Sequence, residues 1–370
     1  MSKRIVLAGG GTGGHLFPLV TIAKYLKENT KEKIDFLFLG PEGKLEEELM
    51  DKNNIPQKKI LSGKIRRYIS FKYLVDFLKI PIGFFQSLWH LLRYMPDVIF
   101  SKGGYASVPV VLAAKVYGIP VVIHESDAVP GIANKFLGSI ANKIIINFER
   151  AKVHFPESKT VLMGIPVKKS ALEGDKERGR RVLSMEKEIK PVVLFLGGSL
   201  GAQRINEEVV GGIDNLIKEF QVIHQTGKDH YDYISREVEK KGYKIEHSDY
   251  YPIDFIREEL GDLLALADIV VSRAGATNIA EIAANGKPTI LVPITNSANN
   301  HQRINAYELA KKKAAVVLEG KNFSRNLLLY NLKEINTKED FKNKLKNNIK
   351  QFYYPEATQK ISEEILNCIK

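Results

Sequence analysis

The chain has 370 residues, of which 44% are hydrophobic, and its 55 lysines and arginines exceed its 43 acidic residues to give a net charge of +12. This length is typical of two domains, and the single cysteine, Cys368, excludes a disulfide framework and a cysteine metal cage. The sequence shows no signal peptide and no apolar run of ~20 residues, which predicts a cytoplasmic protein that is soluble or peripheral, and its positive charge indicates an anionic partner: nucleic acid, anionic lipid or a phosphorylated substrate.

The first predicted element is a short buried strand, Ile5–Ala8, which runs into a glycine-rich turn and then a helical pattern from Phe17 onward. Glycines allow positive φ angles and a close approach of ligand to backbone. A turn that opens a helix presents free N–H groups and the positive end of the helix dipole. His15 is the only side chain there that titrates near neutral pH. The stretch therefore predicts an anion site with a histidine at its mouth.

Three of these glycines, Gly9, Gly11 and Gly14, also satisfy the dinucleotide pattern Gly-x-Gly-x-x-Gly. That interpretation requires an acidic residue at the end of the second strand to hold the adenosine ribose. The second predicted strand, Ile34–Leu39, ends in Gly40-Pro41, and Glu42 lies past the turn. An NAD(P)-dependent oxidoreductase remains an alternative, weakened by this mismatch.

The next distinctive stretch, residues 58–95, combines positive charge with large apolar side chains in segments too short to span a bilayer. Residues 58–72 contain six basic residues and no acidic one: Lys58, Lys59, Lys64, Arg66, Arg67 and Lys72. The apolar residues of the whole stretch include Tyr68, Phe71, Phe77, Phe84, Phe85, Leu88 and Trp89. This combination predicts contact with an anionic membrane surface, with burial of the apolar residues in the core as the alternative. No RNA-binding or helix-turn-helix signature accompanies the charge, so we expect no nucleic acid partner.

Strand and helix patterns alternate along the whole chain, which predicts an α/β fold with two doubly wound parallel sheets. The expected strands are Ile5–Ala8, Ile34–Leu39, Val98–Ser101, Val121–Glu125, Ile144–Asn147, Thr160–Met163, Val192–Leu196, Val222–Gln225, Ile269–Ser272, Thr289–Val292 and Ala315–Leu318. Between the two series, Leu172–Lys190 reads as a charged helical stretch.

The two halves repeat the same strand, glycine turn and helix. Residues 5–10 correspond to 193–198, and 97–104 correspond to 268–275. Ligands of such sheets collect at the carboxyl ends of the strands, so we expect the glycine turns of both halves to line a cleft. Two of these turns carry a cation, Lys102 or Arg273, which predicts a diphosphate site.

Other polar residues follow the predicted strands. Glu281 lies one turn into a helix, where its carboxylate could accept hydrogen bonds from both hydroxyls of a ribose. An exposed helix glutamate is the simpler interpretation. The amide-rich segment 293–305 suits a sugar, and residues 124–127 add a histidine and two carboxylates. No Asp-x-Asp or His-x-x-x-His pattern is present, so we expect no metal site.

These motifs together resemble the MurG family of peptidoglycan N-acetylglucosaminyltransferases, glycosyltransferase family 28, from residue 4 to about 345. The quoted motifs are Gly9 to His15, Gly103-Gly104-Tyr105, His124-Glu125, Gly197-Gly198-Ser199 and Ser272 to Glu281. The resemblance implies a GT-B fold with an acceptor- and membrane-binding Rossmann-like domain at 1–165, completed by a C-terminal helix within about 347–370, and a donor domain at 166–346. It implies no cofactor.

The family's reaction, carried over by resemblance, is transfer of GlcNAc with inversion from UDP-GlcNAc to the MurNAc C4 hydroxyl of undecaprenyl-diphosphate-MurNAc-pentapeptide (lipid I), which gives lipid II. His15 is then the expected general base. The implied substrate-binding residues are Thr12, Gly13, Gly14 and Tyr105 in the first half; Ile256 for the uracil; Glu281 for the ribose; Ser199, Ala276, Thr277, Asn278, Ile279 and Ala280 for the diphosphate; and His301 and Gln302 for the GlcNAc.

Three positions depart from the family pattern. Asp127 replaces an expected asparagine, Lys168 an expected arginine and His301 an expected glutamine. Lys168 keeps the positive charge but lacks the bidentate guanidinium. Asp127 adds a carboxylate that could orient His15 or itself serve as the base, so both are candidate catalytic residues.

The resemblance also implies partners and a location. The expected partners are UDP-GlcNAc, lipid I and an anionic membrane surface, and the expected location is the cytoplasmic face of the cell membrane, in peripheral association, with a role in cell wall biogenesis, cell shape and division. Besides the oxidoreductase, two alternatives remain: another lipid glycosyltransferase of the same fold, such as a diacylglycerol glycosyltransferase, and a UDP-GlcNAc epimerase.

Overall fold

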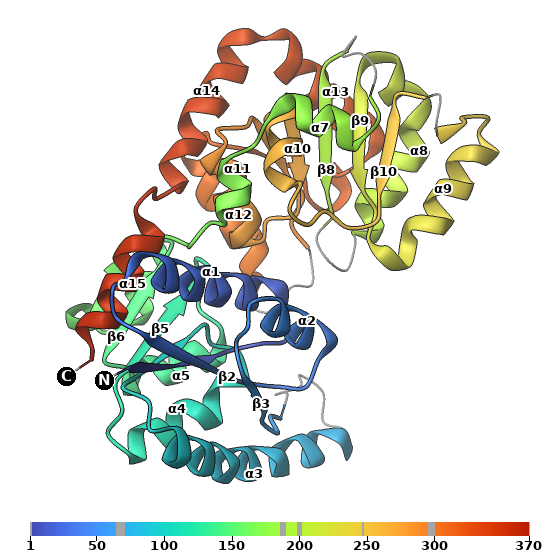
Figure 1. The fold of residues 1–370 in the computed structure, drawn as a ribbon. Coiled ribbons are helices and arrows are strands. Elements are labelled where there is room, and N and C mark those ends of the chain that lie inside the picture. Colours follow the sequence, from blue (N-terminus) through green and yellow to red (C-terminus); the bar gives the residue numbers. More distant parts are fainter. Residues whose placement is uncertain are drawn as a thin grey trace. The chain divides into compact units, whose positions relative to one another are not determined.

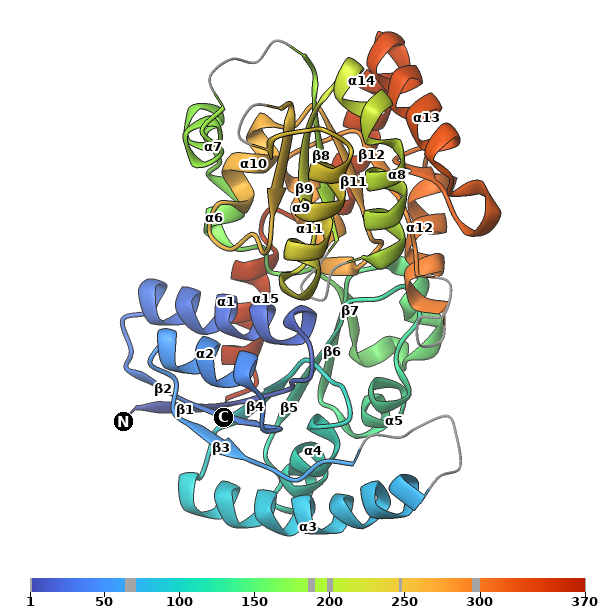
Figure 2. The same ribbon diagram turned by 90° about the vertical axis from the view of Figure 1, so that its right-hand side faces the viewer.

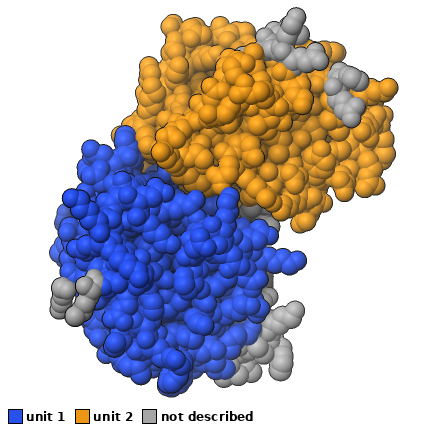
Figure 3. Space-filling model, in the orientation of Figure 1, with its two compact units in different colours: residues 1–167, 354–370 blue, residues 168–353 orange. Residues whose placement is uncertain are grey.

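The structure, a computed structural model, describes residues 2–63, 71–185, 190–197, 202–245, 248–294 and 300–369; the side chains of 71–78 and 321 are left out of the description. The chain divides into two compact units (Figure 3). Unit 1 comprises Met1–Val167 and Tyr354–Lys370, and unit 2 comprises Lys168–Tyr353. We describe each unit by itself.

Unit 1 contains a seven-stranded sheet of order β3-β2-β1-β4-β5-β6-β7, and every neighbouring pair is parallel (Figure 1). Its strands are β1 (Lys3–Ala8), β2 (Ile34–Gly40), β3 (Gln57–Lys59), β4 (Val98–Ser101), β5 (Val121–Glu125), β6 (Lys143–Ile146) and β7 (Thr160–Leu162). Its helices are α1 (Gly13–Asn29), α2 (Lys44–Lys52), α3 (Phe71–Tyr94), α4 (Ser107–Val116), α5 (Ile132–Ile140), η1 (Glu149–His154), η2 (Glu157–Lys159) and α15 (Ala357–Asn367).

Unit 2 contains a six-stranded parallel sheet of order β10-β9-β8-β11-β12-β13. Its strands are β8 (Val192–Leu196), β9 (Gln221–Gln225), β10 (Tyr250–Ile253), β11 (Ile269–Ser272), β12 (Thr289–Leu291) and β13 (Val316–Val317). Its helices are α6 (Lys169–Leu172), α7 (Lys176–Val182), α8 (Gln203–Glu219), η3 (Lys228–His230), α9 (Tyr231–Lys240), α10 (Leu260–Leu266), α11 (Ala276–Ala284), α12 (His301–Lys311), η6 (Gly320–Asn322), α13 (Arg325–Thr337), α14 (Glu339–Ile349) and η7 (Lys350–Phe352).

The predicted α/β class with two doubly wound parallel sheets is confirmed, and each of the predicted strands is present. Two edge strands were missed, β3 and β10. The sequence of β3, Gln-Lys-Lys, has no apolar residue, and β10 carries Pro252. An edge strand needs neither two buried faces nor a full set of backbone donors, so neither sequence shows a strand pattern.

Helices cover both faces of the unit 1 sheet (Figures 1 and 2). Apolar residues of α1, α2 and α15 pack on one face, where Leu19, Met50 and Ile361 share a core with Leu7 and Phe100. Residues of α3, α4, α5 and η1 form the core on the other face. The last helix of the chain is thus part of the unit that contains the first strand, because it supplies apolar side chains to the same core.

The unit 2 sheet also lies between helices, with α7 and α10 on one side and α8 and α13 on the other (Figure 2). The latter helices bury residues such as Val209, Ile213, Leu328 and Leu332 against the sheet. The charged helical stretch predicted over 172–190 contains one short helix, α7, and the last residue of α6; residues 186–189 of it lie outside the described residues.

Among the described helices, none is both long and apolar enough to cross a bilayer. The apolar stretch predicted for a membrane surface forms α3, which continues through Pro81. Its outer face exposes Ile82, Phe85, Trp89 and Leu92 by 48 to 67%. Of the basic residues predicted to accompany them, Lys58 and Lys59 lie in β3, whereas Lys64, Arg66 and Arg67 lie outside the described residues, as does the side chain of Lys72.

Candidate active site

The glycine turn after β1 adopts a backbone that only glycine accommodates. Gly10 and Gly11 have φ angles of +133° and +89°. A Cβ on Gly10 would lie 2.6 Å from Pro41, and a Cβ on Gly11 would lie 3.3 Å from the Tyr105 ring. The turn therefore packs directly against the turn after β4, and α1 begins at Gly13 with Thr12 as its cap. The exposed backbone of Thr12 and Gly14 lies at the positive end of this helix.

A buried carboxylate holds this turn, and the sequence analysis missed it. Glu46, in the first turn of α2, is 5% exposed, and its Oε1 accepts a hydrogen bond from the Gly11 N–H at 2.7 Å. An acidic residue at a helix start is ordinarily explained by the helix dipole, so the sequence carries no signal for this contact.

His15 lies in the first turn of α1 and is half-buried. Its Nδ1 lies 3.0 Å from the carbonyl oxygen of Gly10. Because a carbonyl can only accept, Nδ1 carries the proton, and in the neutral ring Nε2 keeps its lone pair. The ring also contacts Gly104, where an added Cβ would lie 3.1 Å from Cε1. The geometry is that of an oriented proton acceptor.

The structure corrects the expectation that Lys102 offers its charge to a diphosphate. Its side chain is only 2% exposed at the end of β4, and Nζ lies 2.7 Å from His124 Nδ1 and donates a hydrogen bond to Ser126 Oγ. The other ring nitrogen of His124 lies 2.8 Å from the Gly164 carbonyl, so it donates and Nδ1 accepts. Burial lowers the pKa of Lys102 to about 8, against the opposing effect of Glu125 and Asp127.

The segment after β5 is held by a second set of contacts. Glu125 is 5% exposed; its Oε1 accepts from the Asp127 N–H at 2.8 Å and its Oε2 from Asn134 Nδ2 at 2.9 Å. Burial raises the pKa of Glu125 to about 7, with a further contribution from the Asp127 charge. The predicted residues Tyr105 and Asp127 lie in the loops after β4 and β5, and His15 lies in the first turn of α1, so all three are at the carboxyl ends of unit 1 strands.

Unit 2 presents its own helix start after β11. Gly275 caps α11, in which Ala276, Ile279 and Ala280 are buried and Thr277 and Asn278 are half-buried; the Asn278 amide donates to Ser272 Oγ at 3.2 Å. Glu281 is 6% exposed, and burial raises its pKa to about 7, which the Lys168 charge partly opposes. The simpler interpretation of Glu281 as an exposed helix glutamate is therefore wrong.

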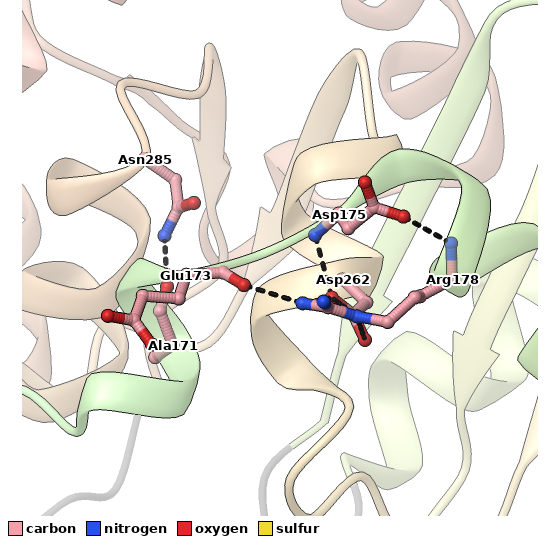
Figure 4. Close-up of polar contacts among 6 residues, drawn as sticks. All are labelled: Ala171, Glu173, Asp175, Arg178, Asp262 and Asn285. Atoms are coloured by element: carbon pink, nitrogen blue, oxygen red, sulfur yellow. Dashed lines mark hydrogen bonds and ion pairs between the residues drawn. The ribbon is translucent and has the colours of Figure 1, made fainter.

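Unit 2 begins at Lys168, and hydrogen bonds hold the segment that follows this residue (Figure 4). The Asp262 carboxylate accepts from the Asp175 N–H at 2.7 Å and from Arg178 Nη2 at 2.9 Å. Asn285, directly after α11, donates to the Ala171 carbonyl at 2.8 Å. The structure thus joins the segment of Lys168 to the helix of Glu281, although these residues are far apart in sequence.

The remaining predicted donor residues lie at other loops of unit 2. Ile256 is buried after β10, and His301 and Gln302 form the first turn of α12, where Gln302 Oε1 accepts from the Ile294 N–H at 3.2 Å. Ser199 lies outside the described residues. Among the described residues, no group of three or more histidines, cysteines or acids could hold a metal ion.

Comparison with known families matches both halves of the chain. The glycosyltransferase family 28 N-terminal domain matches residues 5–146, and the family 28 C-terminal domain matches residues 192–361.

Similar proteins of known name cover nearly all of the chain. A protein of Clostridium perfringens (strain SM101) is 38% identical over 345 residues, 93% of each chain; it is named UDP-N-acetylglucosamine--N-acetylmuramyl-(pentapeptide) pyrophosphoryl-undecaprenol N-acetylglucosamine transferase. A protein of Bacillus cytotoxicus with the same name is 36% identical over 99% of this chain and 100% of its own.

Two solved structures share the fold. The crystal structure of Acinetobacter baumannii MurG has a TM-score of 0.75 and 25% identity and covers 99% of both chains. The structure of a UDP-GlcNAc 2-epimerase from Neisseria meningitidis, bound to UDP-GlcNAc, has a TM-score of 0.70 over 99% of this chain and all of its own at 12% identity, which shows a common fold and nothing more.

Proposed function

The chain belongs to glycosyltransferase family 28, and on that premise we propose that it transfers GlcNAc from UDP-GlcNAc to undecaprenyl-diphosphate-MurNAc-pentapeptide, lipid I, to give lipid II in peptidoglycan synthesis. The observation that carries this proposal is the similarity to enzymes named for this transfer, at 36 to 38% identity across both units. An epimerase shares the fold at 12% identity, which supports no shared activity.

In this proposal unit 2 binds the donor. The start of α11, at Ala276 to Ala280, binds the diphosphate at the positive end of the helix, and Ser199 contacts the same group. Ile256 contacts the uracil, and His301 and Gln302 bind the hydroxyls of GlcNAc. Glu281 accepts hydrogen bonds from the ribose diol, a role that suits a buried carboxylate because the diol supplies the donors that burial has removed.

Lys168 contributes positive charge to the same site. Its charge acts on Glu281, and the contacts of Asp262 in α10 and of Asn285, directly after α11, keep its segment next to these two helices. A lysine in place of arginine supplies a point charge without a bidentate fork.

Unit 1 binds the acceptor and supplies the base. His15 Nε2 takes the proton of the MurNAc C4 hydroxyl as its oxygen attacks the anomeric carbon, and UDP departs from the opposite face, which inverts the configuration. The Gly10 carbonyl holds the proton on Nδ1, so the acceptor lone pair of the neutral ring is on Nε2. Thr12, Gly13, Gly14, Tyr105 and Asp127 contact substrate around this histidine, and Asp127 is the second candidate for the base.

We propose that unit 1 also docks on the cytoplasmic face of the cell membrane. The support comes from α3, where Phe85 and Trp89 are 67% and 57% exposed and Arg93 lies 5.6 Å from the Trp89 ring. Apolar and aromatic side chains next to basic ones suit the interface of an anionic bilayer. A lipid-linked acceptor makes such contact useful, because the reacting sugar stays at the membrane surface.

Radiolabelled transfer from UDP-GlcNAc to a lipid I analogue tests the function. UDP-Glc and UDP-Gal as donors, and diacylglycerol as acceptor, distinguish another lipid glycosyltransferase. We expect label only in the lipid I product from UDP-GlcNAc. Label in a diacylglycerol product, or no transfer to lipid I together with epimerisation of free UDP-GlcNAc, would overturn the proposal.

Cosedimentation with vesicles containing anionic phospholipid tests the membrane contact. We expect the double variant Phe85→Ser/Trp89→Ser to lose most vesicle binding, because the inserted apolar area is removed. Tyr330→Ser, which removes a 58% exposed aromatic from unit 2, is the matched control and should bind as the wild type does. Equal binding by all three proteins would rule out α3 as the contact.

A further inference from the structure

Six residues of unit 1 form a closed ring of contacts beneath the histidine turn; we define the Lys102 ring as Lys102, Gly103, Glu125, Ser126, Asp127 and Asn134. We propose that Lys102 is a positioning residue for glycosyl transfer, whose buried ammonium group locks the turn that touches His15 to the segment that carries Asp127. This inference rests on the function proposed above and gives Lys102 a role other than the phosphate binding that its sequence position predicted.

The burial of Lys102 is energetically costly. An ammonium group removed from water loses several kcal/mol of hydration free energy unless it is paired. Lys102 is only 2% exposed, and its Nζ bonds to the neutral ring of His124 and to the hydroxyl of Ser126. The nearby carboxylates, Glu125 and Asp127, act on it through charge. A buried ammonium group whose direct partners are neutral does not add to stability in an obvious way, which indicates that Lys102 has another role.

The ring closes through contacts of four kinds. Lys102 bonds to Ser126, and Ser126 is followed by Asp127, whose N–H bonds to Glu125 at 2.8 Å. Glu125 accepts from the Asn134 amide at 2.9 Å. The side-chain amide of Asn134 also packs against Gly103, where an added Cβ would lie 2.1 Å from Asn134 Oδ1. Gly103 follows Lys102 and completes the circuit.

His15 contacts this ring through the next residue of the turn. Gly104 has a φ of +80°, and an added Cβ would lie 3.1 to 3.2 Å from the imidazole. Movement of the turn by a fraction of an ångström would therefore move the imidazole or leave a gap beside it. A misplacement of about 1 Å in a catalytic group can cost ~10²-fold in rate.

Lys102→Met tests this directly, because methionine keeps most of the length and apolar volume of the stem and removes the ammonium. We expect kcat for transfer to lipid I to fall by ~10- to 100-fold, while the KM for UDP-GlcNAc and the affinity for UDP stay within about twofold, since the donor residues lie in unit 2. Loss of a fold-stabilising residue alone would not separate kcat from donor KM in this way.

Two substitutions of Ser126 keep the inference testable if Lys102→Met does not fold. Ser126→Ala removes the hydroxyl that Lys102 bonds and should lower kcat by ~10-fold, and Ser126→Thr keeps the hydroxyl and should restore it. Lys159→Met is the matched control: its Nζ donates to the Ala141 carbonyl at 3.0 Å at the start of β7, the other end of the sheet, and its kcat should equal that of the wild type.

The outcomes separate the two proposals. Wild-type kcat in folded Lys102→Met, equal losses in Ser126→Ala and Ser126→Thr, or a parallel loss of UDP affinity would each overturn the role of Lys102. Absence of transfer to lipid I by the wild-type protein would overturn the proposed function instead.

Discussion

The turns after β4 and β11 start from matching sequences, Ser-Lys-Gly-Gly in unit 1 and Ser-Arg-Ala-Gly in unit 2, and they end in different structures. In unit 1 both glycines have positive φ angles and are crowded by side chains. In unit 2 the first of these two glycines is replaced by Ala274, and Gly275 has a φ of −69° with open space where a Cβ would be. The repeated pattern therefore serves two purposes: one turn packs on a histidine, and the other leaves a helix start accessible.

The cations of these two turns, Lys102 and Arg273, also differ in their burial and in their hydrogen-bond partners. Lys102 points inward to His124 and Ser126, whereas Arg273 is half-buried and donates to the Val292 carbonyl at 3.3 Å. Burial and the neighbouring Arg204 lower the pKa of Arg273. Cations at equivalent positions after two strands thus have different partners: a histidine and a serine side chain for Lys102, and a backbone carbonyl for Arg273.

The largest expected effect is at the histidine of unit 1. His15→Ala should lower kcat by ~10²-fold or more, because the oriented proton acceptor is lost, while UDP affinity measured by calorimetry stays unchanged. His154→Ala, which removes an exposed histidine of η1 in the same unit, should have wild-type activity. An unchanged kcat in His15→Ala would leave Asp127 as the base.

A matched pair of substitutions compares the two turns themselves. Gly104→Ala should lower kcat by ~10-fold and the free energy of unfolding by about 1–2 kcal/mol, because alanine is strained at a positive φ and its Cβ meets His15. Gly275→Ala should change the free energy of unfolding by less than about 0.5 kcal/mol. Urea unfolding and transfer assays measure both, and equal destabilisation would show that the turns do not differ.

Glu281 sets the pH dependence of the unit 2 site. Since its pKa is about 7, the carboxylate that accepts the ribose hydroxyls is present above pH 7 and is protonated below. Wild-type affinity for uridine, which has no phosphate to titrate, should fall as the pH drops from 8 to 6. Glu281→Gln should bind about 10-fold more weakly at pH 8 and show no such slope. A slope that persists in Glu281→Gln would assign it to another group.

The same carboxylate should affect stability with the opposite sign. Because its pKa is raised by folding, the native state binds more protons than the unfolded state between about pH 4.5 and 7. Wild-type stability relative to Glu281→Gln should therefore decrease as the pH rises through this window, by on the order of 1–3 kcal/mol. Urea unfolding of both proteins at pH 5 and 8 measures the difference.

The smallest effect is expected at the segment of Lys168. Asp262→Ala removes the bonds from Asp175 and Arg178 and should destabilise unit 2 by about 1 kcal/mol. The KM for UDP-GlcNAc should rise about two- to threefold, because the segment that begins at Lys168 is held by fewer contacts. Glu177→Ala, which removes an exposed partner of Arg180, should leave both quantities unchanged. Identical results for the two variants would show that this segment does not position Lys168.

Much of this protein can be predicted from its sequence because the relevant signals are local. Consecutive apolar residues define β1, β5 and β8, and consecutive glycines define the turn before His15, since strand burial and positive φ angles depend on neighbouring residues. The same contiguous motifs carried the family resemblance. Two of the four edge strands, β3 and β10, were missed, because a strand that is paired on one side needs no distinctive sequence.

The tertiary structure alone decided which side chains meet. The sequence predicts that Lys102 faces a ligand, but its contact with His124, 22 residues away, lies in the interior. Glu46 has the sequence position of an ordinary acid at a helix start, but it bonds to Gly11, 35 residues away, and so holds the histidine turn. Glu281 likewise becomes a buried carboxylate only once the sheet is assembled. The burial of a side chain and the identity of its hydrogen-bond partners depend on residues that folding brings together, so they cannot be predicted from spacing along the chain.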